Sequence, residues 1–170
     1  PTVSERLKRL GIRDALIWAA LVAAFLLSAL LVAGLCTDAC KATYRWTIFR
    51  TKFPVLGIGF FALSMVLFSL RRRPLMRSAF AVAIAGAWGA EAVFLYTQHS
   101  IIKRWCPMCL AVAFCVCVAG VALAAGPIAA ARREAGPGRA TMSRLFKGAG
   151  LAAVMFAGAF VAFLGMGSPP

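Results

Sequence analysis

Residues 104–120 read RWCPMCLAVAFCVCVAG, in which a Cys-x-x-Cys pair is followed directly by an apolar run. Two thiols with two residues between them typically bind a metal ion or take part in redox chemistry. The apolar run continues to residue 126, which is long enough to cross a lipid bilayer as a helix, a crossing that takes about 20 residues. The stretch therefore predicts a reactive cysteine pair at the boundary between a membrane and water.

The composition of the whole chain favours a membrane protein. Of its 170 residues, 62% are hydrophobic and 14% are charged, whereas a soluble domain is about half apolar and about a quarter charged. Backbone groups find no water inside lipid, so the spans are expected to be helices. We therefore predict an all-α integral membrane protein, a single domain over residues 1–170, with five spanning runs at 15–35, 54–70, 78–98, 107–126 and 148–165. The first run, at 21 residues, is longer than the core of a secretory signal, and we expect it to be retained.

The distribution of basic residues predicts the orientation of these spans. The N-terminus, the connection between the second and third runs, and the connection between the fourth and fifth runs carry 13 of the 19 Lys and Arg residues. The positive-inside rule places these segments in the cytoplasm and the C-terminus outside. Topology and anionic lipid head groups account for the net charge of +14, so nucleic acid is not needed as a partner. We expect a multi-pass protein of the bacterial inner membrane that contacts lipid.

This topology brings two cysteine pairs to the same outer surface. Cys36 and Cys40 lie in an outer loop at 36–53, and Cys106 and Cys109 lie at the outer end of the fourth run. The bacterial periplasm is an oxidising compartment in which disulfides form and persist. We therefore expect thiol–disulfide exchange that passes electrons from soluble thiols to a lipid-soluble acceptor.

The residues around the second pair predict which thiol is the more reactive. Pro107 suits the first position of a helix, which makes Cys106 the helix cap. The helix dipole and the nearby charges of Lys103 and Arg104 favour a thiolate at that position. We expect Cys106 to be an exposed thiol of low pKa, and Cys109 to point into the helix bundle.

Several features together resemble the vitamin K epoxide reductase family in its bacterial form, over about residues 15–165. They are an outer loop with two cysteines, the proline near the start of FPVLGIGFFAL at 53–63, a basic cytoplasmic loop, CPMC at 106–109 opening the fourth run, and a fifth run that ends outside. The resemblance implies a four-helix transmembrane bundle around a quinone site, with a fifth transmembrane helix beside it.

The resemblance also implies roles for the four cysteines. Cys109 would react with a quinone, ubiquinone or menaquinone, and Cys106 would be its disulfide partner. Cys40 would exchange with Cys106, and Cys36 would accept electrons from a thioredoxin-like periplasmic protein, which is either separate or a removed C-terminal domain. The expected activity is that of a quinone-dependent thiol–disulfide oxidoreductase that supports oxidative protein folding, and simple quinone reduction is favoured over epoxide reduction.

Four residues are expected at the quinone site: Cys109, Glu91, Gln98 and Phe114. Glu91 is the one charged residue, counting Asp, Glu, Lys and Arg, within a predicted span. Such a carboxyl group either serves function or bonds a neighbouring helix. Gln98 lies seven residues after it and therefore on the same helical face. Four aromatic residues are candidates for the wall of a quinone pocket, although packing in the core or against lipid is the favoured interpretation for any single one of them; these are Phe60, Phe61, Phe94 and Phe114.

Three alternatives stay open at this point. A related disulfide-forming family has the same chemistry but carries its Cys-x-x-Cys pair in the first outer loop, the reverse of the order seen here. Four thiolates are also a ligand set for structural zinc. Finally, structural disulfides would staple a membrane scaffold that has no redox activity.

Overall fold

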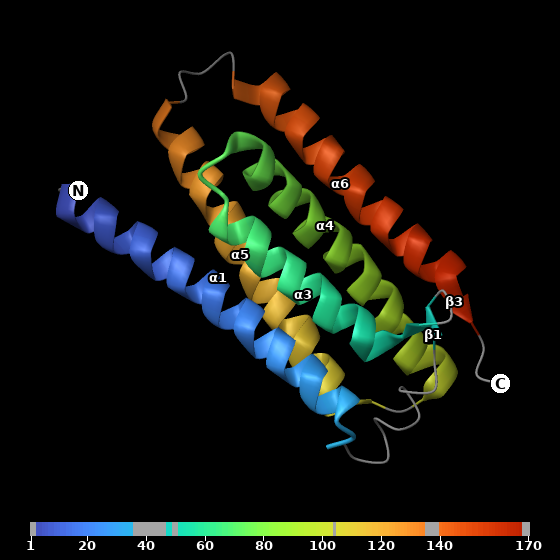
Figure 1. Cartoon of the computed structure of the whole chain (residues 1–170). Coiled ribbons are helices and arrows are strands. Elements are labelled where there is room, and N and C mark those ends of the chain that lie inside the picture. The colour runs from blue at the N-terminus through green and yellow to red at the C-terminus, as the bar shows by residue number, and fades with distance from the viewer. Residues whose placement is uncertain (1–2, 36–46, 49–50, 104, 135–139, 168–170) are drawn as a thin grey trace.

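The computed structural model describes residues 3–35, 47–48, 51–103, 105–134 and 140–167. Five long helices dominate this part of the chain (Figure 1). They are α1 (Val3–Val32), α3 (Phe53–Ser69), α4 (Pro74–Thr97), α5 (Pro107–Glu134) and α6 (Ala140–Gly165). Each of the five apolar runs predicted from the sequence forms one of these helices.

Proline marks the start of three of these helices. Pro54 stands in the first turn of α3, and α4 and α5 begin at Pro74 and Pro107. A proline has no N–H to leave unpaired in the first turn, and its fixed backbone angle already suits a helix. The helix boundaries in the middle of the chain therefore follow from local sequence.

Four of the helices pack as a closed ring, and the fifth lies outside it. Helix α1 packs against α3 and α5, helix α4 packs against the same two, and α6 packs against α4 (Figure 1). The main core lies inside the ring and includes Ile17, Leu21, Phe61, Phe68 and Phe80. The ring sets the positions of the residues that face its interior.

Small residues let α4 and α6 approach closely. A Cβ atom on Gly89 would meet the backbone carbonyl oxygen of Met155, and one on Gly158 would meet the carbonyl oxygen of Gly86. Membrane helices associate through such small-residue contacts because lipid provides no hydrophobic drive for helices to pair. The α4–α6 pair is therefore built for backbone contact.

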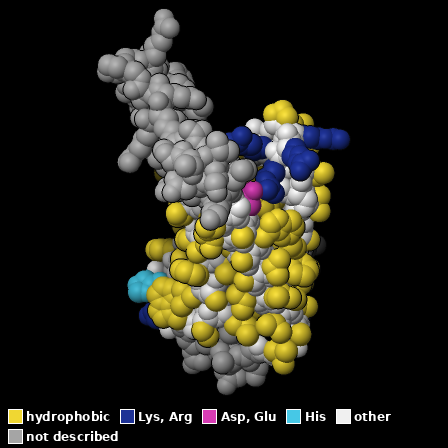
Figure 2. All heavy atoms as spheres, turned by 90° about the vertical axis from the view of Figure 1, so that its left-hand side faces the viewer, with side chains coloured by type: hydrophobic (Ala, Val, Ile, Leu, Met, Phe, Trp, Pro, Cys, Tyr) yellow, Lys and Arg dark blue, Asp and Glu magenta, His cyan; other side chains and the backbone are white. Residues whose placement is uncertain are grey.

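Within the described residues, three helices are long and apolar enough to cross a membrane, over Gly11–Val32, Pro74–Ile102 and Pro107–Ala125. Helix α3 and the segment Ala152–Gly165 of α6 are also apolar, but they are shorter. Figure 2 shows a broad band of hydrophobic side chains, with most of the visible Lys and Arg side chains at one end of the molecule. The observed architecture is thus that of a mostly helical membrane protein, and the crossing of α3 and α6 stays a prediction.

An ion pair ties α1 to the turn after α3 at the basic end. Arg71 Nη2 lies 2.6 Å from Asp14 Oδ2, and Arg71 Nη1 donates to the carbonyl oxygen of Phe68 at 3.2 Å. The guanidinium also lies over the Phe68 ring, 4.2 Å from its centroid. Two of the segments assigned to the cytoplasm therefore lie at the same end of the molecule, as their charges predict.

A small antiparallel sheet at the opposite end departs from the all-α expectation. It consists of β1 (Thr47–Ile48), β2 (Thr51–Lys52) and β3 (Met166–Gly167), in the order β2-β1-β3. Thr47 pairs with both Lys52 and Gly167. The sheet forms because the start of α3 and the end of α6 meet at this end, an arrangement that the strand sequences alone do not reveal.

Candidate functional site

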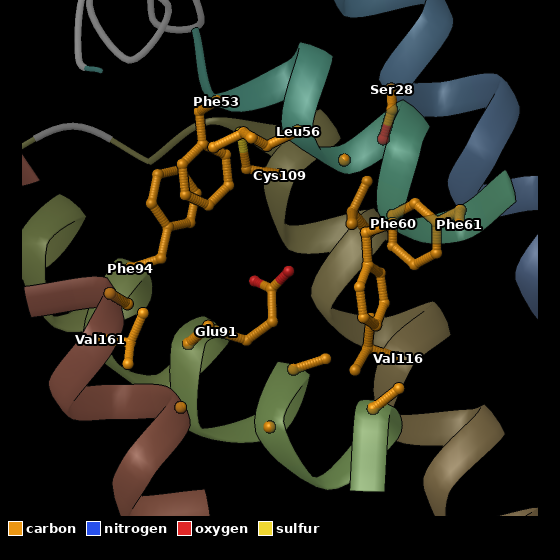
Figure 3. A pocket seen from close by; sticks show the side chains of 18 of the residues that line it. Ser28, Phe53, Leu56, Phe60, Phe61, Glu91, Phe94, Cys109, Val116 and Val161 are labelled. Atoms are coloured by element: carbon orange, nitrogen blue, oxygen red, sulfur yellow. The ribbon is translucent and has the colours of Figure 1, made fainter. Parts of the chain in front are cut away.

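A cavity of about 490 Å³ lies among the helices, with residues from α1, α3, α4, α5 and α6 in its walls (Figure 3). Its lining is almost entirely apolar. The exceptions among the described residues are the hydroxyl of Ser28, the carboxyl of Glu91 and the thiol of Cys109. A cavity of this size with few polar groups is typical of a site for a small organic molecule.

Cys106 caps the helix that begins at Pro107. Its carbonyl oxygen accepts a hydrogen bond from the N–H of Leu110 at 3.1 Å. The pKa of Cys106 is lowered to about 6, chiefly by a hydrogen bond from the thiol of Cys109. Burial opposes this lowering, and hydrogen bonds from the backbone N–H groups of Cys109 and Met108 add to it. Cys106 therefore has the low pKa expected from the sequence, and the donors are groups of its own helix.

The expectation that Cys106 is exposed is wrong. Its exposed fraction is 0%, and that of Cys109 is 6%. Both thiols belong to a small apolar cluster with Leu31 and Phe94, against which Phe53 also packs. Their burial follows from packing of the neighbouring helices α1, α3 and α4 over the start of α5. The two cysteines thus form a thiol pair shielded from water.

Gln98 bonds the backbone at Cys106 and does not line the cavity. It opens a π-helical turn, Gln98–Ile102, that extends α4. Its side chain is fully buried, and its Oε1 accepts a hydrogen bond from the N–H of Cys106 at 2.9 Å. Seven residues of helix displace Gln98 about 10 Å along the axis from Glu91, which puts it beyond the cavity on the same face. The contact of Gln98 with a quinone stays a prediction, and in this structure its side chain bonds the backbone of Cys106.

Glu91 is the polar group most directly aimed at the cavity. Figure 3 shows its carboxyl group extending from α4 into the enclosed space. Its Oε2 is buried and has no hydrogen-bond partner among the residues that the structure describes, and none of the described lining residues is Lys or Arg. An unpaired carboxylate in apolar surroundings is costly, so the group is expected to carry its proton. A neutral carboxylic acid offers a hydrogen-bond donor to whatever enters.

Aromatic rings flank the part of the cavity next to Cys109. The rings of Phe53 and Phe94 stack with their centroids 4.1 Å apart and an angle of 12° between their planes. Phe60 and Phe61 pack edge to face, with centroids 5.2 Å apart. All four rings line the cavity (Figure 3), so three of the four aromatic candidates named from the sequence do reach it.

Phe114, which the sequence places at the quinone site, does not line this cavity. Its side chain is 68% exposed, and it is not among the lining residues. The face of α5 that lines the cavity carries Cys109, Val112 and Val116, at spacings of three and four residues. Phe114 falls between these positions and therefore on another face of the helix. Sequence reasoning missed the ring of Phe53. The feature that could have pointed to it is its position next to Pro54, at the end of the molecule that holds Cys106 and Cys109.

Cys36 and Cys40 lie outside the residues that the structure describes. Their predicted exchange with Cys106 therefore stays a prediction. In the described part of the chain, no group of three or more His, Cys, Asp or Glu residues is arranged to hold a metal ion. A zinc site built from all four cysteines would need both of the residues that lie outside.

The cavity and the thiol pair together can support two-electron chemistry. Cys109 lines an apolar cavity and donates its thiol hydrogen to Cys106, so an electron acceptor held in the cavity would lie beside a pair of thiols ready to form a disulfide. The chain matches no protein-family model, no curated protein and no solved structure at a significant level. The functional argument therefore rests on these contacts and on the chemistry of the residues.

Proposed function

We propose that the chain is a membrane thiol:quinone oxidoreductase that oxidises Cys106 and Cys109 to a disulfide. The observation that carries the proposal is the position of Cys109, which lines an apolar cavity of about 490 Å³ and is hydrogen-bonded to Cys106 behind it. A water-soluble electron acceptor has poor access to a thiol pair that is buried in apolar surroundings. A lipid-soluble acceptor, by contrast, partitions into the same apolar region as the cavity.

The residues of the cavity fit a quinone such as ubiquinone or menaquinone. Flat aromatic walls suit a flat ring, because offset stacking between rings is favourable. The Oε2 of Glu91 has no hydrogen-bond partner among the described residues, and a quinone carbonyl would give that carboxyl group one. The wall that α6 contributes makes the fifth helix part of the proposed site.

Cys106 and Cys109 have different roles in the proposed reaction. Cys106 holds the negative charge, because three hydrogen-bond donors around its sulfur favour the thiolate. Cys109 presents its sulfur to the cavity and is the thiol placed to react with the acceptor. A bound quinone takes up two electrons and two protons and becomes a quinol. Both electrons come from the two cysteines, whose sulfurs are left joined in a disulfide.

We further propose that the disulfide is passed on at the periplasmic face of a bacterial inner membrane. Cys40 would exchange with the Cys106–Cys109 pair, and Cys36 would pass the disulfide to a thioredoxin-like protein. These roles rest on the resemblance to the bacterial vitamin K epoxide reductase family. The corresponding architecture is a four-helix transmembrane bundle around the quinone, with α6 as a fifth transmembrane helix.

Quinone reduction by purified protein tests the proposal. The protein in detergent is mixed with a dithiol and a soluble quinone, and the quinone absorbance is followed against a mixture without protein. We expect reduction that depends on the protein, and its loss in Cys109→Ala. Cys115→Ala is a matched control, because Cys115 lies on the same helix, packs against the main core and does not line the cavity. Equal activity in all three proteins, or no activity in a folded protein with reduced thiols, would refute the proposal.

A further inference from the structure

The proposed reaction needs more protons than the pair of Cys106 and Cys109 supplies. Forming a quinol takes two electrons and two protons. The pKa of Cys106 is lowered to about 6 by the hydrogen bonds to its sulfur, so the thiolate is its favoured form at pH 7. The reduced pair then holds two electrons for the acceptor but only one proton, which is on Cys109. A second proton has to come from another group at the cavity or from water.

Few side chains at the cavity are able to supply that proton. Helix α3 and the cavity-lining part of α6, residues 154–162, contain no titratable side chain. The cavity face of α5 contributes Cys109, whose proton is already counted. On α1, the hydroxyl of Ser28 donates to the carbonyl oxygen of Ala24 at 2.8 Å and is a very weak acid. The carboxyl group of Glu91 on α4 is the remaining candidate in the described lining.

The environment of Glu91 suits a proton donor. Its carboxyl group points into the cavity (Figure 3), and its Oε2 has no hydrogen-bond partner. An ordinary structural carboxyl group inside a membrane bundle bonds a neighbouring helix or a basic side chain. Glu91 does neither in the part of the chain that the structure describes. Its hydrogen-bonding capacity is directed at the cavity contents.

We propose that Glu91 is the general acid of the cavity, which hydrogen-bonds a carbonyl oxygen of the quinone and transfers to it the second proton of reduction. This proposal rests on the proposed function. The balance is complete: the thiolate of Cys106 and the thiol of Cys109 give up two electrons and form one S–S bond. Cys109 loses one proton, Glu91 loses the other, and one quinol results. The Glu91 carboxylate then regains a proton from water before the next turnover.

The proposal defines the class of acceptor by its chemistry. The acceptor has to be lipid-soluble and must carry a carbonyl oxygen that becomes a hydroxyl group on reduction. A general acid cannot assist the reduction of a one-electron acceptor that takes up no proton, such as a metal complex. The cavity is thereby specific for quinones over electron carriers that do not bind protons.

Two variants of Glu91 separate hydrogen bonding from proton transfer. Glu91→Gln keeps a hydrogen-bond donor of the same size but has no acidic proton, so we expect quinone KM to change little and kcat to fall by about 100-fold, at the lower end of a general acid's contribution. Glu91→Leu loses both functions and is expected to raise KM as well. Ser64→Ala serves as control, because Ser64 is a fully buried polar residue that does not line the cavity.

A second measurement observes the carboxyl group without turnover. In a Cys109→Ser background, which blocks electron transfer, infrared difference spectra are recorded as a soluble quinone is added. We expect the carbonyl stretch of a protonated carboxylic acid to shift on quinone binding, and this shift to be absent when Glu91→Gln is added. The Ser64→Ala control is expected to keep it. Equilibrium dialysis of the same proteins measures quinone binding in parallel.

The outcomes distinguish this inference from the proposed function. If the wild-type protein neither binds nor reduces quinone, the proposed function fails and the role of Glu91 fails with it. If the wild-type protein reduces quinone and Glu91→Gln does so at the same kcat, the proposed function stands and the general-acid role is overturned. A quinone-induced carboxyl band that persists in Glu91→Gln also overturns it.

Discussion

Replacement of Cys109 by alanine is expected to raise the pKa of Cys106. The largest cause of the low pKa of Cys106, about 6, is the hydrogen bond that its sulfur accepts from the thiol of Cys109. The backbone N–H groups of Met108 and residue 109 remain in the variant, so part of the lowering remains. The change removes one donor to the thiolate and leaves the helix start intact.

The size of this shift follows from the strength of a hydrogen bond to a charged group. Such a bond contributes about 1.5–3 kcal/mol, and one pKa unit corresponds to about 1.4 kcal/mol. The pKa of Cys106 is therefore expected to rise by about one to two units in Cys109→Ala. At pH 7 the thiolate fraction would fall from about nine-tenths to between about a tenth and a half. The sign is definite: loss of a donor disfavours the charged form, so more alkaline conditions are needed to ionise Cys106.

Thiolate absorbance in the ultraviolet, followed as the pH is raised, measures this shift. The titration is done with Cys36 and Cys40 replaced by serine, and the spectrum of a matching variant that also lacks Cys106 is subtracted. Cys109→Ser is the matched control, because its hydroxyl group keeps a donor near the Cys106 sulfur. We expect the absorbance step to move to higher pH in Cys109→Ala and to move less in Cys109→Ser. A step at the same pH in the parent and in Cys109→Ala would refute the role given to the Cys109 thiol.

Two further changes test the packing around the site. Gln98→Leu leaves the buried N–H of Cys106 without its acceptor, and we expect it to lower stability by about 1–3 kcal/mol; an unchanged thermal unfolding midpoint in detergent would contradict this. A Cβ on Gly120 would lie 2.5 Å from Nε1 of Trp88, so Gly120→Ala is expected to destabilise the protein by about 1–3 kcal/mol through overpacking. Gly59→Ala is its control, because a Cβ there meets nothing within 4 Å; equal unfolding midpoints for the two variants would count against the clash.

The sequence alone was enough to predict the helices and the end of the molecule at which the redox motif lies. Apolar runs and the prolines near the helix starts are local features, and a helix needs only local backbone hydrogen bonds. The low pKa of Cys106 was also predictable. Its donors, the N–H groups of Met108 and Cys109 and the Cys109 thiol, belong to the same turn of helix as Cys106 itself.

The contents of the cavity and the burial of the thiols depend on how the helices meet. The sequence pointed to Phe114 and not to Phe53, yet the rotation of α5 turns Phe114 outward while α3 carries Phe53 onto Phe94. Cys106 is buried because Leu31 and Phe94, distant in sequence, pack beside it. Gln98 reaches the Cys106 backbone only because the turn after α4 brings residue 106 back to it. Contacts of this kind depend on the relative rotation and height of separate helices, which hydrophobic spacing within one helix does not specify.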